Sequence, residues 1–400
     1  MAELWAGIDA GKTHHHCVVI DAAGDRKMSR QFGNDEGEIL ALISDVVALA
    51  HGSEIVWATD LNRGPAGLLI DCLTDNNQVV LYISGRTVHH AAQAYRGDGK
   101  TDAKDAAIIA DQARMRRDLQ RIDRTDETAT ELRLLTAHRE DLVCDRTRAV
   151  NRLRSTLLEY FPGLEAGFDF NRRKGALMLL TKYQTASDIR RAGVTRIANY
   201  LRKNNAYHAD EIATAAVTIA TRQQATVAGE ATAALIVADL ARAVLRLIRE
   251  VEALDKRIQE RVETHADSQI LLSIPGFGPL MTAEFIAAID GDVTNFSSPD
   301  RLAGIAGVCP VPRDSGRLTG NHHRPKRYNR TLLRVCYLTA QSAARTCPQS
   351  RAYYDRKRQE GKNHKQAVLA LARRRINVIW ALLRDRTTFV SSATELPTAA

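Results

Sequence analysis

The sequence predicts an α/β domain followed by a chain that is almost entirely helical. Three short segments near the N-terminus have the pattern of strands, the last two joined by a turn at Ala22–Gly24. Strand-like and helix-like segments then alternate up to about residue 116. Beyond residue 126, two long stripes of apolar residues at helical spacing indicate long amphipathic helices. Together these patterns predict an α/β plus α fold class.

The first domain is expected over residues 1–125. Its predicted elements are, in order, strands at 4–8, 14–20 and 27–32, a helix at 36–49, a strand at 54–59, a helix at 64–72, a strand at 79–83 and a helix at 102–116. Three consecutive strands favour an antiparallel meander, and the later alternation favours parallel strands with helical crossovers. A meander followed by βαβα units is the element order of an RNase H-like mixed sheet.

A helical, coiled-coil region is expected over residues 126–268. Its first stripe comprises Leu132, Leu135, Leu142, Ala149, Leu153 and Leu157, and its second comprises Leu240, Val244, Leu247, Val251, Leu254, Ile258 and Val262. The second stripe is close to a heptad seam, so the two stripes are expected to pair with each other or with another subunit. Residues 161–229, between the stripes, are expected to form a helical insert.

A mostly helical C-terminal domain is expected over residues 269–390. The segment "LLSIPGFGPLMTAEFIAAI", residues 271–289, places a glycine-rich turn between two apolar helices. This arrangement indicates a helix-hairpin-helix motif, whose turn amides can hold a DNA phosphate, or an ordinary tight connection between helices. Residues 391–400 are expected to be a disordered tail.

Composition excludes several classes of protein. In 400 residues, 44% are hydrophobic and 26% charged, which is ordinary for a globular protein. No stretch approaches the roughly 18 to 20 apolar residues of a membrane span, and the N-terminus lacks a signal-peptide core. The six cysteines include no Cys-x-x-Cys pair, which argues against a zinc ribbon or disulfide framework and favours a cytoplasmic location.

Positive charge is concentrated near the C-terminus. The chain has a net charge of +9, and residues 313–375 hold 17 lysines and arginines against three acids. Such a block predicts a nucleic-acid partner, because cationic side chains release counterions from phosphates. The alternative is a solvated basic helix surface.

Two apparent ligand sites near residues 7–16, "GIDAGKTHHH", fail on spacing. A phosphate loop needs four residues between its first glycine and Gly-Lys-Thr, but only three separate Gly7 from Gly11. A second Gly-Lys-Thr, at 99–101, lacks the opening glycine. Of three consecutive strand histidines only His14 and His16 share a face, so neither an ATP site nor a zinc site is expected.

Four aspartates are the candidate chemical site. Asp9 ends the first strand, Asp60 follows the strand at 54–59, and Asp102 and Asp105 begin a helix. Adjacent strand ends and an i, i+3 helical pair could bring all four together. Hard oxygen ligands suit Mg²⁺, or Mn²⁺, and two such ions can support phosphodiester cleavage. Individually, each aspartate could instead be a helix cap, a first-turn acid or a strand-end residue.

The motifs "GIDAGK", "ATD", "GDGKTDAKDA", "IPGFGPLMTAEFIAAI" and "LAGIAGVCPVPRDSG" together resemble the DEDD transposases of insertion sequence family 110, whose relatives include a site-specific DNA invertase. The resemblance covers nearly the whole chain. It implies a RuvC-like domain, a coiled coil and a C-terminal transposase domain. It also implies a catalytic tetrad at Asp9, Asp60, Asp102 and Asp105, and a nucleophile at Ser315.

The same resemblance implies a bridge-RNA-guided recombinase that joins DNA to serine. The resemblance further implies that the tetrad and the serine come from different subunits of a dimer or tetramer. One departure is Asp60, because the family pattern has glutamate there; Glu54, at the far end of the same strand, is too distant to substitute. The expected contacts to nucleic-acid phosphates are Lys12, Lys100, Arg313, Arg317, Arg324, Lys326, Arg327 and Arg330.

Two other functions fit these residues. One is a RuvC-like nuclease that hydrolyses DNA junctions with water, with Ser315 as a bystander. The other is a nucleic-acid-binding relative that has lost activity, for which the Asp60 departure is the main support.

Overall fold

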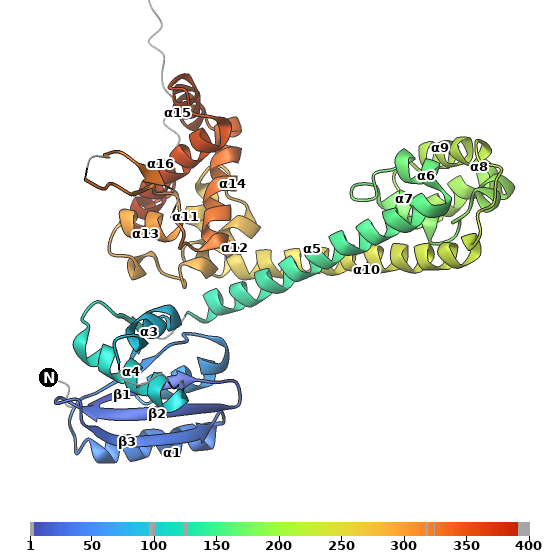
Figure 1. The fold of residues 1–400 in the computed structure, drawn as a ribbon. Helices are drawn as coiled ribbons and strands as arrows, with labels where there is room; N and C mark the ends of the chain where they lie inside the picture. The colour runs from blue at the N-terminus through green and yellow to red at the C-terminus, as the bar shows by residue number, and fades with distance from the viewer. Residues whose placement is uncertain are drawn as a thin grey trace, which may run out of the picture. The chain divides into compact units, whose positions relative to one another are not determined.

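The computed structural model describes residues 4–95, 99, 101–122, 126–316, 319–323 and 325–390. The chain divides into two units, Met1–Thr125 and Asp126–Ala400. Figure 1 shows an α/β first unit and a second unit that is nearly all helical. The predicted α/β plus α class is therefore confirmed at this level, while the predicted tail at 391–400 lies outside the described residues.

The first unit contains a six-stranded mixed sheet with strand order β3-β2-β1-β4-β5-β6. The strands are β1 Leu4–Ala10, β2 His14–Asp21, β3 Arg26–Gly33, β4 Ile55–Thr59, β5 Val79–Tyr82 and β6 Gln120–Ile122. β1, β2 and β3 form the expected antiparallel meander, and β4 and β5 continue the sheet in parallel to β1. β6, which pairs antiparallel to β5, was not expected from the sequence.

Helices cover both faces of this sheet. They are α1 Glu36–Leu49, the short 3₁₀ turn η1 Gly64–Ala66, α2 Gly67–Asp75, α3 Gly85–Ala92 and α4 Asp102–Met115. Leu4, Ala6 and Ile8 of β1 share a core with α1 and α2. Trp5 points the other way and packs with α3 and α4. Because side chains alternate along a strand, Gly7 and Asp9 also lie on the α4 face.

Two long helices form the backbone of the second unit. α5 Glu127–Tyr160 and α10 Glu230–Glu263 run side by side, as Figure 1 shows. They are antiparallel, since Arg139 near the start of α5 pairs with Asp255 near the end of α10 at 2.5 Å. The stripes were expected to pair with each other or with another subunit, and the structure shows the first of these pairings. The expected insert is helical too, with α6 Pro162–Gly167, α7 Lys174–Leu180, α8 Ala186–Lys203 and α9 Ala209–Thr221.

The remainder of this unit is a helical domain with one small hairpin. Its elements are α11 Ser268–Ser273, α12 Pro279–Ala288, η2 Val293–Asn295, α13 Pro299–Ile305, β7 Val311–Pro312, β8 His322–His323, α14 Arg330–Thr346, α15 Pro348–Gln359 and α16 His364–Arg384. The β7–β8 hairpin was not among the elements expected from the sequence. None of the helices in the described chain is long and apolar enough to cross a membrane.

The glycine-rich turn at 274–278 joins α11 to α12, as the sequence indicated. Gly276 has φ of +92°, and a Cβ atom there would lie 2.4 Å from the Thr339 carbonyl oxygen. Ile274 and Phe277 are buried in the core of the domain. The glycine is therefore required by close packing against α14.

Candidate active site

Asp9 and Asp60 lie at the same edge of the sheet. β1 and β4 are parallel, with Ile8 paired to Thr59, so Asp9 and Asp60 both follow this pair at the same level of the sheet. Asp9 is still within β1, where it pairs with His16, whereas Asp60 comes directly after β4. The Ala10 amide donates a hydrogen bond to Asp60 Oδ1 at 3.3 Å. Glu54 precedes the opposite end of β4, which agrees with the expectation that it cannot take the place of Asp60.

Helix α4 brings Asp102 and Asp105 to this edge. Thr101 caps the helix by accepting a hydrogen bond from the Lys104 amide at 3.2 Å. The helix lies directly on β1, because a Cβ atom on Gly7 would be 2.2 Å from the Ala106 carbonyl oxygen and 2.3 Å from the Ala110 nitrogen. Gly7 thus permits the contact that places the first turn of α4 beside Asp9.

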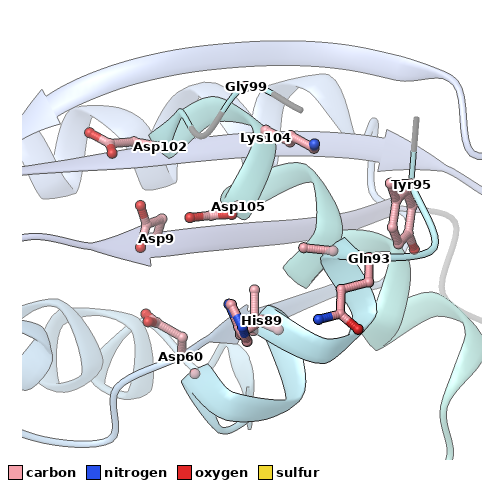
Figure 2. A pocket seen from close by; sticks show the side chains of 12 residues that line it. Asp9, Asp60, His89, Gln93, Tyr95, Gly99, Asp102, Lys104 and Asp105 are labelled. Atoms are coloured by element: carbon pink, nitrogen blue, oxygen red, sulfur yellow. The ribbon is translucent and has the colours of Figure 1, made fainter. Parts of the chain in front are cut away.

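The four aspartates line one cavity of about 490 Å³, which we call the acidic pocket. They come from β1, from the residue after β4 and from the first turn of α4. Figure 2 shows Asp105 directed toward Asp9, with Asp60 below them and Asp102 further out. The structure therefore brings together residues that are up to 96 positions apart in the sequence.

The environment of the acidic pocket disfavours the negatively charged form of Asp60. Burial raises the pKa of Asp60, and the negative charge of Asp105 raises it further. Burial lowers the pKa of His16, which pairs with Asp9 across the sheet, although the nearby charge of Asp102 opposes this. A concentration of carboxylates with this pattern is stabilised when a cation is bound.

The chemistry of the donor set fits a hard divalent cation. The acidic pocket offers four carboxylate side chains, the ligand type that Mg²⁺ and Mn²⁺ prefer. In the described part of the chain, no group of three or more His, Cys, Asp or Glu side chains is already arranged to hold a metal ion. Within the histidine run, His15 is buried against Phe32 while His14 and His16 lie on the other face of β2, as the alternation of strand side chains predicted.

Ser315 lies in the second unit, at the exposed end of the β7–β8 hairpin. Hydrogen bonds from Asn321 and to it help to close this hairpin. The Arg313 amide donates to the Asn321 carbonyl oxygen at 2.8 Å, and the Asn321 amide donates to Asp314 Oδ1 at 3.0 Å. Gly316, which follows the serine, has φ of +47°. Ser315 itself is exposed to solvent.

The expected phosphate contacts fall in two places. Lys12 is exposed in the turn between β1 and β2, and Arg313, Lys326, Arg327 and Arg330 are exposed in and after the serine hairpin. Lys100, Arg317 and Arg324 lie outside the described residues.

His89 and Lys104 are among the lining residues of the acidic pocket that sequence reasoning missed. His89 belongs to α3, a helix that the sequence analysis did not predict. The available signal was its cap, because the Ser84 hydroxyl accepts from the Thr87 amide in a Ser-x-x-Thr pattern. Lys104 stands between the two helical aspartates, and it introduces positive charge into the acidic pocket.

Two family models match this chain. One, described as a transposase of the DEDD type associated with IS110, matches residues 6–162 and so contains the acidic pocket. The other, described as the transposase IS116/IS110/IS902 family, matches residues 268–355 and so contains the serine hairpin.

Three relatives match over nearly their full length. The uncharacterized 42 kDa protein of insertion element IS900 from Mycobacterium paratuberculosis is 54% identical, over 98% of this chain and 98% of the relative. The uncharacterized 44.8 kDa protein of IS116 from Streptomyces clavuligerus is 46% identical, over 99% and 98%. The uncharacterized 43.6 kDa protein of IS110 from Streptomyces coelicolor is 34% identical, over 97% and 96%.

Proposed function

The chain belongs to the IS116/IS110/IS902 family of transposases, and from this premise we propose that it cleaves and rejoins DNA strands through a covalent link to Ser315. The observation that carries the strand-cleavage part of this proposal is the acidic pocket, where four aspartates from three separate elements converge. A cluster of carboxylates lowers the stability of a fold unless a bound cation neutralises its charge.

We further propose that the four aspartates hold Mg²⁺ or Mn²⁺. The ion would supply positive charge that stabilises the scissile phosphate during strand cleavage. The packing of α4 on β1 supports this role for Asp9 and Asp105, because it brings their elements into contact. Lys104, in the same pocket, carries a charge suited to holding the DNA backbone.

The serine step is a transesterification. The Ser315 hydroxyl oxygen forms a bond to the scissile phosphorus, one phosphorus–oxygen bond of the DNA strand breaks, and the departing strand oxygen takes a proton. Rejoining reverses these changes with a hydroxyl of the partner strand as the attacking group. The exposure of Ser315 and the neighbouring charge of Arg313 support this assignment, since arginine can stabilise charge on a phosphate.

A DNA substrate designed to trap the intermediate tests this mechanism. We expect a protein–DNA adduct that resists denaturation and is lost in Ser315→Ala, while Thr319→Ala, which removes another hydroxyl from the same hairpin, retains it. Asp105→Asn should lower cleavage by more than about a hundredfold, because a charged group at the reacting centre is removed. Asp71→Asn, on the exposed surface of α2, is the matched control.

Two results would contradict these assignments. Cleavage that continues in Ser315→Ala without an adduct would identify a water-dependent nuclease. Undiminished strand exchange after Asp9→Asn together with Asp105→Asn would exclude the acidic pocket as the reacting site.

We also propose that a bridge RNA guides the choice of DNA target. The resemblance to insertion sequence family 110 and the basic C-terminal stretch support this idea, because a protein that holds backbones can leave sequence recognition to base pairing. Sequencing of RNA that copurifies with the protein should reveal one structured species. A random sample of cellular RNA, together with full activity after ribonuclease treatment, would contradict it.

A further inference from the structure

A small cavity of about 110 Å³ lies in the second unit, outside the serine hairpin. It is enclosed by the turn before α12, the junction between α14 and α15, α16 and the segment after α16. Its polar lining consists of Cys347, Gln349, Ser350, Tyr353, Arg374 and Arg375. None of the described residues that line it is acidic, so the cavity has two arginines and no internal carboxylate.

Arg375 is a buried cation at this cavity. Its side chain belongs to a residue that is only 8% exposed, and Nη2 donates to the Pro275 carbonyl oxygen at 2.5 Å. Nε is buried and has no hydrogen-bond partner within the described chain. Burial lowers the pKa of Arg375 to about 10, so the group is still charged at neutral pH. A buried charge is costly unless an anion accompanies it.

The surroundings of the cavity favour negative charge as well. The cavity adjoins the N-terminus of α15, a helix of 12 residues, where backbone amides carry partial positive charge. Burial acts to raise the pKa of the Cys347 thiol, yet the neighbouring polar groups of Ser350 and Gln349 outweigh this effect and lower it. The same end of the cavity therefore stabilises an anion.

A cluster of cations extends from the cavity to the surface. The Tyr353 ring, at the rim, has the Arg356 and Arg374 guanidinium carbons at 4.9 Å and the Lys357 ammonium at 5.5 Å from its centroid. Arg374 is exposed and makes no ion pair with an acid in the described chain. Lys357 and Arg356 pair with Glu360 at 2.7 and 3.9 Å. Arg374 is therefore the cation of this cluster that an approaching anion would meet before it reached Arg375.

We propose that this cavity binds a phosphate group. Arg374 and Arg375 supply the charge, and the Ser350 hydroxyl and the N-terminal end of α15 supply further donors, as in other helix N-terminal phosphate sites. A free phosphate ion and a phosphate of a nucleic-acid strand share this chemistry. The assignment is separate from the serine mechanism and does not depend on it.

Thermal unfolding of the full chain tests the proposal. Inorganic phosphate should raise the Tm of the wild type above its value in sodium chloride of the same ionic strength. In Arg374→Met, the apparent Kd for phosphate should rise about tenfold or more, because a charge-assisted contact is lost. Arg345→Met, which removes an exposed arginine at the end of α14, should leave the response unchanged. Arg375→Met should abolish it; if that variant fails to fold, Arg374→Met decides.

Alkylation of cysteine locates the site and distinguishes the source of the phosphate. Phosphate should slow the alkylation of Cys347, which lines the cavity, and leave that of exposed Cys144 unchanged. A single-stranded oligodeoxynucleotide with a 5′-phosphate, compared with the same strand lacking it, shows whether a strand end is bound. If both strands protect Cys347 from alkylation, the cavity binds a backbone phosphate. If only inorganic phosphate protects Cys347, the cavity binds the free ion. No phosphate response in the wild type, or equal responses in Arg374→Met and Arg345→Met, would overturn the proposal.

Discussion

At the scale of single residues, Asp60 shows how a site can oppose the stability of its own fold. It stands where the family pattern has glutamate, one methylene longer, and it is half-buried after β4. Burial and the nearby charge of Asp105 both raise its pKa. Its negative form is therefore less favourable in the folded protein than in the unfolded chain.

This direction of shift predicts a pH-dependent stability. A carboxyl group whose pKa is higher in the folded than in the unfolded state makes its full contribution to stability below the unfolded pKa, near 3.9. That contribution is lost as the pH rises through the pKa of the folded state. In a chelating buffer at pH 7 to 8, Asp60→Asn should therefore raise Tm by on the order of a few degrees. The difference in Tm between Asp60→Asn and the wild type should shrink as pH falls toward about 4.

Calorimetry across this pH range checks the expectation, with Asp71→Asn on exposed α2 as the control. A lower Tm for Asp60→Asn at neutral pH would show that the negative charge of Asp60 stabilises the metal-free fold. The same variant should lose strand cleavage, so stability and activity should move in opposite directions.

At the scale of elements, the acidic pocket depends on how closely α4 approaches β1. Small residues on both sides permit the contact, since Gly7 faces the fully buried Ala106 and Ala110. A glycine inside a strand ordinarily weakens it, and here it marks a close backbone approach. The position of Asp105 relative to Asp9 follows from this contact.

Gly7→Ala should therefore destabilise the first unit and impair the site. The new Cβ atom would overlap the backbone of α4, and overpacking of this kind costs about 1–3 kcal/mol or more. Gly67→Ala is the matched control: it lies in α2 with nothing within 4 Å, and should stabilise by about 0.5–1 kcal/mol. Urea unfolding measures both, and equal effects of the two substitutions would contradict the packing argument.

The helix pair offers a second test at this scale. Leu157 and Leu158 are neighbours in α5, but the first is 0% exposed in the core of the insert and the second is 54% exposed. Leu157→Ala should cost about 2–5 kcal/mol, because it leaves a cavity. Leu158→Ala should change stability by less than about 0.5 kcal/mol, unless another subunit covers it. A denaturant titration of both variants distinguishes these cases.

At the scale of the whole molecule, the proposed reacting groups belong to different units. The acidic pocket is built entirely from the first unit, and Ser315 belongs to the second. We propose that the working assembly is a dimer or tetramer in which the tetrad and the serine come from different subunits.

Mixing inactive variants tests this assembly. Asp105→Asn and Ser315→Ala should each be inactive alone, whereas coexpression should restore part of the strand exchange, because some sites then contain an intact tetrad and an intact serine. At equal expression about one quarter of random pairings would carry both intact parts at a given site. No recovery, with mixed oligomers verified by two affinity tags, would indicate that each subunit works alone.

The sequence by itself determined the local elements and the chemistry of the candidate groups. Strand alternation, heptad-like spacing and helix caps depend on neighbouring residues, so the meander, α1, α4 and the α5 and α10 stripes could be predicted closely. Short elements were missed, because α3, β6 and the β7–β8 hairpin carry too few residues for periodicity to show.

Only the tertiary structure decided which side chains meet. The parallel pairing of β1 with β4, and the close packing of α4 at Gly7, place the four aspartates in one cavity and add His89 and Lys104 to it. The cavity at Arg375 likewise depends on tertiary packing, because residues of α15 line it together with residues of α16, the helix that carries Arg375. Such contacts join residues far apart in the chain, and burial and charge there are properties of the packed molecule, which local sequence patterns do not specify.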